Sequence, residues 1–239
     1  MITGAAGGMG SVVADRFLAN DDIVIATNTG ADILASFAAD RSAGDRLATI
    51  VADVSKEEDC AKLADASRDK AGRIDVLVHC AGFFPIRRLE EITVQEWRTV
   101  IEVNLTGAFL LTRAVVPLMK RRGWGRIINF GSSSIFEGVP GQAQYVAAKA
   151  GIVGFSRCIA HEFGEYGITV NVVARGLTVT APVKKNFPPE LLEDQKKRRG
   201  IQRDEVPEDL VGTTFFLASP DADFISGQMI NVDGGKNMH

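Results

Sequence analysis

The chain has 239 residues, 46% of them hydrophobic and 24% charged, with a formal net charge of -3 at pH 7, which predicts one soluble α/β domain with a sizeable core. The slightly acidic balance argues against a protein that binds nucleic acid or membranes through general positive charge. The sequence shows neither a leader of basic and then apolar residues nor an apolar run approaching the roughly 18 residues of a membrane span, so we expect neither feature.

A glycine-rich segment, TGAAGGMG at 3–10, lies directly before the helical pattern SVVADRFLA. Glycines let the backbone turn sharply and approach a pyrophosphate, while the N-terminus of a helix supplies N–H donors and a partial positive charge. The spacing G-x-x-x-G-x-G differs from the common dinucleotide fingerprint, and by itself indicates nucleotide binding only weakly. Only Met1 and Ile2 precede it, so we expect a first strand that is either very short or incomplete.

Short apolar runs then alternate with helical patterns along the chain. The runs that predict strands are 22–27, 48–53, 74–82, 125–132, 168–174 and 227–235, and the helical patterns include 55–71, 93–122 and 143–166. Continuously apolar strands separated by helices are typical of a parallel sheet covered on both faces. We therefore expect an α/β, doubly wound fold in a single domain spanning residues 1–239.

The most polar stretch is 183–209, VKKNFPPELLEDQKKRRGIQRDEVPED. One interpretation is a solvated surface excursion. The other is a mobile substrate lid, because long insertions near strand ends often cover a site.

Cysteine and histidine usage indicates the compartment and argues against a metal. Cys60, Cys80 and Cys158 are odd in number, scattered and without metal-ligand spacing, and the three histidines do not cluster. We therefore expect a reducing compartment, most simply the cytoplasm, and no metal site.

Tyr145 and Lys149 are one helical turn apart in the segment YVAAK, which follows the serines Ser132 to Ser134. A free phenol, with a pKa of about 10, is a poor base at pH 7. A nearby ammonium favours the phenolate and lowers that pKa towards working pH. The pair is therefore a candidate proton carrier, and the alternative is a surface tyrosine and lysine on an amphipathic helix.

Several motifs occur in a recognisable order: TGAAGGMG, Asp53–Val54, HCAG at 79–82, Asn104 in VNLTG, the serines before Y-x-x-x-K, and ISGQMINVDGG near the end. In this combination, and along essentially its whole length, the sequence resembles the short-chain dehydrogenase/reductase family. The resemblance implies a Rossmann-type domain with a seven-stranded parallel sheet, NAD(H) or NADP(H) as cofactor, and oxidoreductase activity that interconverts a ketone and a secondary alcohol.

The resemblance also assigns a catalytic set of Ser132, Tyr145, Lys149 and Asn104. Ser132 is selected over its neighbours because the family serine lies thirteen residues before the tyrosine. In the family, serine hydrogen-bonds the substrate oxygen, lysine supplies charge and holds the nicotinamide ribose, and asparagine anchors a water. The cofactor-binding residues that it implies are Gly4, Gly8, Met9, Gly10, Thr27, Asn28, Asp53, Val54, Ala81, Gly82, Tyr145, Lys149, Gly176 and Thr180.

Some positions depart from the family pattern. The residue that ends the second strand is Thr27 rather than the Asp that binds the ribose of NAD, and no basic residue at Asn28 or Gly7 marks NADP, so the cofactor preference stays open. His79 is either a cofactor contact or a packing residue, and Cys80 is expected to be a small buried residue rather than a reactive thiol. Arg175 replaces the usual proline. Three interpretations stay open for it: contact with a substrate anion, contact with the cofactor phosphates, or a side chain that points to solvent.

The substrate is expected to be a small, mostly apolar ketone or secondary alcohol. Segments such as VPLMKRRGWGRIINF are similar to those of bacterial secondary-alcohol dehydrogenases. Candidate pocket residues are Phe83, Phe84, Phe136, Val139 and Phe187 for apolar walls, with Arg87, Arg88 and Arg175 for anion contacts.

Two alternatives remain. The first is a 3-oxoacyl-carrier-protein reductase, with MKRRGWGR at 119–126 as a basic docking patch, although Glu165 and Tyr166 lie where such reductases tend to be basic. The second is a dinucleotide-binding regulator without turnover. By resemblance, the helices near 104–122 and 145–165 pair across a subunit interface, which implies a homodimer or homotetramer.

Overall fold

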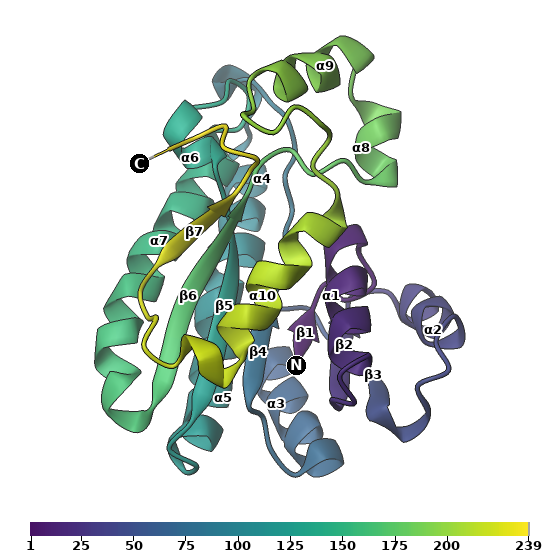
Figure 1. Ribbon diagram of the computed structural model, residues 1–239, viewed down its shortest axis with the longest axis vertical. Helices are drawn as coiled ribbons and strands as arrows, with labels where there is room; N and C mark the ends of the chain where they lie inside the picture. The colour runs from purple at the N-terminus through teal and green to yellow at the C-terminus, as the bar shows by residue number, and fades with distance from the viewer. Residues whose placement is uncertain (239) are drawn as a thin grey trace.

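The computed structural model describes residues 1–238, with the side chains of Pro182 and Asn186 outside that description. Its centre is a seven-stranded, parallel sheet in the order β3-β2-β1-β4-β5-β6-β7 (Figure 1). The strands are β1 Ile2–Thr3, β2 Val24–Asn28, β3 Leu47–Val51, β4 Val76–His79, β5 Gly125–Ser132, β6 Ile168–Arg175 and β7 Met229–Val232. The predicted α/β, doubly wound fold is thereby confirmed.

Helices cover both faces of the sheet, as continuously apolar strands require. They are α1 Gly8–Leu18, α2 Ala31–Ala39, α3 Glu57–Ala71, α4 Val94–Ile101, α5 Gly107–Lys120, α6 Ser134–Glu137, α7 Ala143–Phe163, α8 Ala181–Asn186, α9 Pro189–Lys197 and α10 Val211–Ala218. Figure 1 shows α1 and α10 in front of the sheet and α4 and α5 behind it.

Each face has its own apolar core. On one face, Phe17 of α1, Phe37 of α2 and Leu217 of α10 pack over strand residues such as Ile128. On the other face, residues of α3, α5 and α7 pack over Leu77, Ile127 and Val170. Because helices cover both faces of the sheet, a ligand site is expected at the edge formed by the carboxyl ends of the strands.

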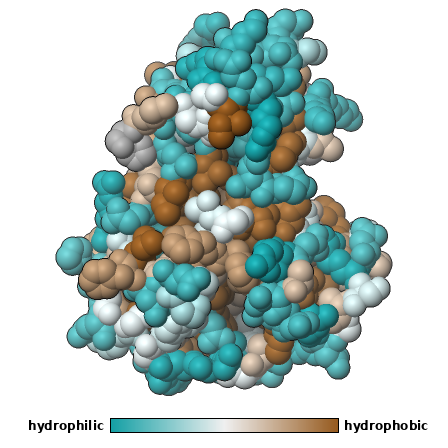
Figure 2. Space-filling view, viewed as in Figure 1, coloured by the Kyte–Doolittle hydropathy of each residue, from teal (hydrophilic) through white to brown (hydrophobic). Residues whose placement is uncertain are grey.

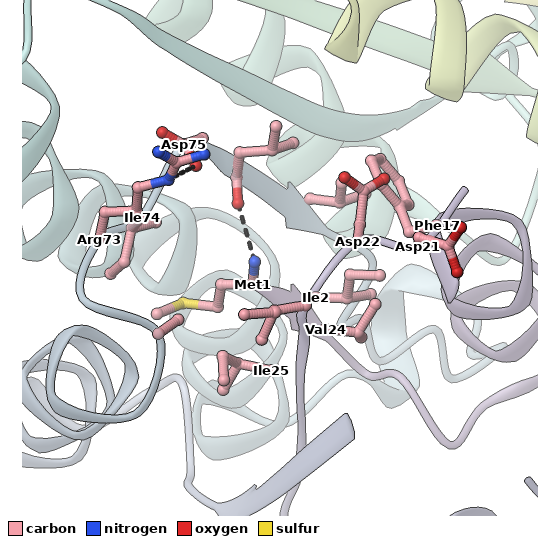
Figure 3. Close-up of a pocket in the computed structure, with 14 residues that line it drawn as sticks. Met1, Ile2, Phe17, Asp21, Asp22, Val24, Ile25, Arg73, Ile74 and Asp75 are labelled. Atoms are coloured by element: carbon pink, nitrogen blue, oxygen red, sulfur yellow. Dashed lines mark hydrogen bonds and ion pairs between the residues drawn. The ribbon is translucent and has the colours of Figure 1, made fainter. Parts of the chain in front are cut away.

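Strand β1 is only two residues long, so its neighbours extend past it at their amino ends. Ile2 pairs with Ala26 and Val78, which leaves Val24 and Val76 beyond the register of β1. A cavity of about 300 Å³ lies there. The Met1 ammonium donates to Val76 O at 2.8 Å, and Figure 3 marks a hydrogen bond from Met1 among the residues that line the cavity. This cavity lies at the edge of the sheet away from the glycine-rich turn.

The predicted helix at 93–122 forms as α4 and α5, which are joined without a loop by a π-helical turn, η3 Glu102–Thr106. By length and composition alone, the run Val94–Lys120 could cross a membrane. This differs from our expectation from the sequence. Half of its most apolar stretch is buried inside the protein. That buried half packs on the sheet and on α3 and α7, so the apolar residues have a partner inside the fold.

Helices α8 and α9 lie at the carboxyl edge of the sheet, at the top of Figure 1. Helix α9 lies within the polar 183–209 segment of the sequence, and α8 begins just before that segment and ends inside it. Figure 2 shows this end of the molecule as largely hydrophilic, with hydrophobic residues gathered across the middle of the same face below it.

Candidate active site

The glycine-rich turn joins β1 to α1 and requires glycine for steric reasons. Gly4 has φ of +62°, and a Cβ there would lie 2.9 Å from the backbone nitrogen of Ala81; a Cβ on Gly8 would lie 2.8 Å from Thr180 Cγ2. The first turn of α1 carries no acidic side chain and no side-chain cap. Its N–H groups and partial positive charge are thus free of an internal anion, which suits a pyrophosphate.

A cavity of about 480 Å³ opens over this turn and follows the carboxyl ends of β1 to β4. It brings together ten of the cofactor-binding candidates: Gly4, Gly8, Met9, Gly10, Thr27, Asn28, Asp53, Val54, Ala81 and Gly82, and Thr180 lies on it as well. Thr29, Ala52, Val103 and Thr178 also line it and were missed from the sequence. Val103 stands in the VNLTG motif, where only Asn104 was singled out, and the other three belong to no motif. The residues therefore fit a dinucleotide.

The end of β2 carries no charge that would select the cofactor. The Thr27 side chain is fully buried and its hydroxyl has no hydrogen-bond partner among the described residues. Asn28 Oδ1 accepts from the backbone nitrogen of Thr29 at 2.7 Å. Hydroxyl and amide groups can hydrogen-bond either a ribose hydroxyl or a phosphate.

Tyr145 and Lys149 lie on the buried face of α7, with exposed fractions of 5% and 3%. Lys149 Nζ donates to Phe130 O at 2.8 Å and lies 5.6 Å from the centroid of the Tyr145 ring. Burial raises the pKa of Tyr145, but Arg175 and Lys149, with hydrogen bonds from Ser132 and Arg175, outweigh burial and hold the pKa below its usual value. A phenol so placed can exchange a proton more readily than a free one.

Ser132 ends β5 and faces the same space as Tyr145. Its Oγ lies 2.8 Å from Ser134 Oγ and accepts from the backbone nitrogen of Ser134 at 3.2 Å. Ser132, Ser133 and Ser134 all line a second cavity, of about 410 Å³, together with Tyr145. The spacing argument thus selects the serine whose hydrogen bond helps to lower the pKa of Tyr145.

Asn104 lies in the π-helical turn, a feature that is common at functional sites. Its Nδ2 donates to Phe83 O at 2.7 Å and to Val100 O at 2.9 Å, while its Oδ1 is buried and has no partner among the described residues. A Cβ on Gly82 would lie 3.0 Å from Asn104 Oδ1 and 3.9 Å from Lys149 Nζ. The orphaned oxygen and the ammonium therefore flank one small space, in which a water fits the chemistry.

His79 and Cys80 take packing roles. His79 is fully buried, its Nδ1 lies 2.9 Å from Thr3 Oγ1, and burial lowers its pKa to about 3. Cys80 borders the cofactor cavity, but burial raises its thiol pKa to about 12, so it is a poor nucleophile. Of the two interpretations of His79, the structure favours packing between β1 and β4.

The loop after β6, which carries Gly176 and Thr180, is supported by a buried ion pair that the sequence did not reveal. Glu205 accepts from Thr178 Oγ1 at 2.6 Å and from the backbone nitrogen of Gly176 at 3.0 Å. Arg199 Nη2 lies 3.6 Å from Glu205 and donates to Leu177 O at 3.0 Å. Both residues lie in the polar segment 183–209, where charged residues are expected to face solvent. Only the folded structure therefore shows that they form a buried pair.

The second cavity has mostly apolar walls and a polar far end. Of the predicted lining residues, Phe84, Val139, Phe187 and Arg175 border it, whereas Phe83 borders the cofactor cavity and Phe136, Arg87 and Arg88 do not line it. At the far end, Lys236 Nζ lies 2.7 Å from Glu137 and Arg198 lies 3.2 Å from the same carboxylate. The two cavities share Phe84, Arg175 and Val183, so they adjoin beside Tyr145.

This combination of a doubly wound sheet, a glycine-rich phosphate turn and an adjoining cavity with a buried, activated phenol defines a dinucleotide-dependent oxidoreductase. Comparison with known proteins agrees. The family model described as enoyl-(acyl carrier protein) reductase matches residues 4–237. A short-chain reductase protein NovJ from Streptomyces niveus is 37% identical over 99% of this chain and 92% of its own length.

Two further relatives cover nearly the whole chain. A 3-oxoacyl-[acyl-carrier-protein] reductase from Synechocystis is 38% identical over 100% of this chain and 96% of its own length. The crystal structure of a putative gluconate dehydrogenase from Agrobacterium tumefaciens superposes with a TM-score of 0.93 at 30% identity, covering 98% of this chain and 94% of the other. The chain belongs to the short-chain dehydrogenase/reductase family and is an NAD(P)-dependent oxidoreductase that acts on CH–OH groups.

Proposed function

We propose that this enzyme interconverts a small, mostly apolar ketone and the corresponding secondary alcohol, with Tyr145 as the proton carrier and Ser132, Lys149 and Asn104 as its partners. The observation that carries the proposal is the buried phenol of Tyr145, whose pKa is held low at the junction of the two cavities. When bound, the nicotinamide supplies or accepts the hydride.

The residues act on the charge that develops at the substrate oxygen. In reduction, Tyr145 gives its hydroxyl proton to the carbonyl oxygen and becomes a phenolate, while Ser132 hydrogen-bonds the same oxygen. Lys149 stabilises the phenolate electrostatically. A water held by Asn104 Oδ1 and Lys149 then forms the route by which a proton returns from solvent, and the reverse steps apply to oxidation.

The cofactor side is proposed to be held by the residues around the glycine-rich turn. The N–H groups at the start of α1 would bind the pyrophosphate, and Asp53 and Val54 would border the adenine. Thr180, Gly176 and Lys149 would face the nicotinamide half. Gly176 lines the second cavity rather than the first, which fits a position where cofactor and substrate meet.

The apolar walls of the second cavity support a substrate with apolar substituents. Ile86, Pro140, Leu177 and Leu191 add to the predicted aromatic residues there. Burial of an apolar substituent is worth roughly 25 cal/mol per Å², so such walls favour aliphatic or aryl ketones over hydrated sugars.

The second candidate function is reduction of a 3-oxoacyl thioester on a carrier protein, as the name of the Synechocystis relative suggests for that protein. The basic segment 119–126 does not strengthen this candidate. Arg126 is the second residue of β5 and is buried against Asp223, whereas Ser132 ends that strand, so the segment lies at the edge of the sheet away from the cavity.

The segment 183–209 is proposed to act as a substrate lid. Val183, Phe187, Leu191 and Arg198 form one wall of the substrate cavity, so their displacement would open it. Hydrogen exchange of 181–198 should slow when NADH and a substrate analogue are added together; unchanged exchange would contradict a lid.

A cytoplasmic homodimer or homotetramer is proposed for the assembly. The exposed Phe109 of α5 lies 6.4 Å, between ring centroids, from Phe155 of α7, and this apolar surface on α5 and α7 suits a subunit interface. Analytical ultracentrifugation of wild type and Phe109→Glu tests it: the charge should dissociate the assembly.

The function is tested by absorbance assays with NADH and NADPH against a panel of ketones and acyl thioesters. Turnover of apolar ketones supports the proposal, and turnover confined to carrier-bound thioesters supports the second candidate. Cofactor binding without oxidation across the panel would point to a regulator and refute both.

A further inference from the structure

An arginine at the carboxyl end of β6 lies beside the phenol of Tyr145. Arg175 Nη2 donates to Tyr145 Oη at 3.4 Å. Its guanidinium carbon lies 5.9 Å from the centroid of the Phe84 ring, which in turn lies 6.1 Å from that of Tyr145. Arg175 borders both cavities, so its charge stands where hydride and proton transfer would occur.

Strand register fixes this position. Arg175 of β6 is the register partner of Ser132 of β5, and the backbone nitrogen of Ser133 donates to Arg175 O at 2.9 Å. Partnered residues of adjacent strands project to the same face of a sheet. The arginine therefore comes to the phenol on the same rigid strand pair that positions the serine.

The guanidinium of Arg175 is not held in a close ion pair with a carboxylate. Among the described residues, no ion pair of 4.0 Å or less includes Arg175. Glu205 is the nearby carboxylate. Burial raises its pKa, and the charge of Arg175 partly opposes that shift, but its hydrogen bonds come from Thr178 and the backbone of Gly176 and its close ion pair is with Arg199. The positive charge is thus available to the phenol.

The other titratable groups around the phenol of Tyr145 add no negative charge beside it. Lys149 reaches it from α7. Burial lowers the pKa of this ammonium, and the phenol of Tyr145 opposes that shift. At the end of β4, Cys80 is a neutral thiol and His79 is a neutral imidazole, because burial raises the pKa of the first to about 12 and lowers that of the second to about 3. Of the two cations that lower the pKa of Tyr145, Arg175 has the larger influence.

We propose that Arg175 is a second cation for the catalytic phenol, so that Tyr145 works between two positive charges, Lys149 from α7 and Arg175 from β6. The inference rests on the proposed function for the role of Tyr145. When Tyr145 gives its proton to the carbonyl oxygen, the phenolate accepts a hydrogen bond from Arg175 until a proton from solvent restores the hydroxyl. Arg175 is thereby a positioning residue that acts through Tyr145.

An absorbance titration of Tyr145 tests this without substrate or cofactor. The chain has two tyrosines, Tyr145 and Tyr166, so in a Tyr166→Phe background the tyrosinate absorbance reports Tyr145 alone, and adding Tyr145→Phe supplies the baseline. We expect Arg175→Met to raise the titration midpoint by about one pH unit or more, and Arg175→Lys to keep it nearer the parent.

The matched control is Arg157→Met, which removes the same charge from the exposed face of α7. Positions 145 and 157 are about 18 Å apart along a helix, beyond a Debye length of about 8 Å at physiological salt. The midpoint should therefore not move in this control.

An unchanged midpoint in Arg175→Met, in protein whose far-UV circular dichroism matches the parent, would overturn the inference. A change confined to KM for carboxylate-bearing ketones would also overturn it, because the guanidinium would then serve the substrate. If Arg175→Met does not fold, Arg175→Gln retains a donor without the charge and should raise the midpoint as well. Since no turnover is required, inactivity on every ketone would refute the proposed function while the titration still decides this inference.

Discussion

At the scale of single residues, the site depends on polar atoms held without their usual partners. The hydroxyl of Thr27 and Oδ1 of Asn104 are buried and lack partners among the described residues. Leaving a buried polar atom unpaired costs about 1–3 kcal/mol, so these atoms are poised to gain a hydrogen bond when a ligand or water arrives. Both lie next to the cavity that we assign to the dinucleotide.

The choice between NAD and NADP can be tested at Asn28. Asn28→Asp keeps the oxygen that accepts from the Thr29 backbone at 2.7 Å and adds a negative charge. A carboxylate repels a 2′-phosphate, so we expect the Kd for NADPH to rise about tenfold, or about 1.4 kcal/mol, with little change for NADH. Fluorescence titration measures both constants. Asn20→Asp, on an exposed residue, is the control, and equal weakening of both cofactors would place residue 28 away from the ribose phosphate.

At the scale of elements, the loop after β6 depends on the buried pair of Arg199 and Glu205, whose side chains are 2% and 4% exposed. Arg199→Met would leave the carboxylate buried without its cation. We expect the free energy of unfolding to fall by about 3–5 kcal/mol, measured by urea denaturation at fixed protein concentration.

The control is Arg203→Met, which breaks the exposed pair with Asp209 and should cost far less, since exposed pairs contribute little. The double variant Arg199→Met, Glu205→Gln should lose less than the sum of its single variants because it removes both charges. Additive losses would show that the two side chains do not act as a pair.

The elements also show how far sequence reasoning reaches. Periodicity and motif order predicted the sheet, and the predicted strand 74–82 contains β4, Val76–His79. The end of that run left the strand because Cys80, Ala81 and Gly82 turn to line the cofactor cavity, whereas His79 is the last residue of β4. The π-helical turn at Asn104 was not predictable. The Asn104 side chain donates to Phe83 O, 21 positions away in the sequence, and local patterns do not reveal such a contact.

Site residues that belong to a local sequence motif were predictable. Residues that reach the site only through contacts between distant parts of the chain were not. Tyr145 and Lys149 share a helical face by spacing alone. Arg175 is the cation that lowers the pKa of Tyr145 most. It lies thirty positions after Tyr145 in the sequence and reaches the phenol only because β5 pairs with β6. Its role stayed open in the sequence for that reason.

At the scale of the whole molecule, burial of His79 links stability to pH. Its pKa is about 3 in the folded chain and 6.5 when unperturbed, so the stabilisation from a neutral His79 is complete above pH 6.5 and is lost as pH falls towards 3. The free energy of unfolding should fall by about 1.4 kcal/mol per pH unit below pH 6.5 from this group.

His79→Asn isolates this effect because it removes the titrating group and leaves a polar side chain near Thr3. Urea midpoints at pH 7.5, 6.0 and 5.0 should fall more steeply for wild type than for the variant. An equal pH dependence of the two proteins would contradict this account, because it would show that the pKa of His79 is the same in the folded and the unfolded chain.

The central claim is that Tyr145 carries the proton beside a bound nicotinamide, and turnover of Tyr145→Phe tests it most directly. The hydroxyl is removed while the ring that packs at the site remains, so NADH or NADPH should bind with the wild-type Kd. We expect kcat to fall by about 10²–10⁴-fold, the contribution typical of a general acid–base group. A variant that binds cofactor and turns over substrate at the wild-type rate would contradict the account.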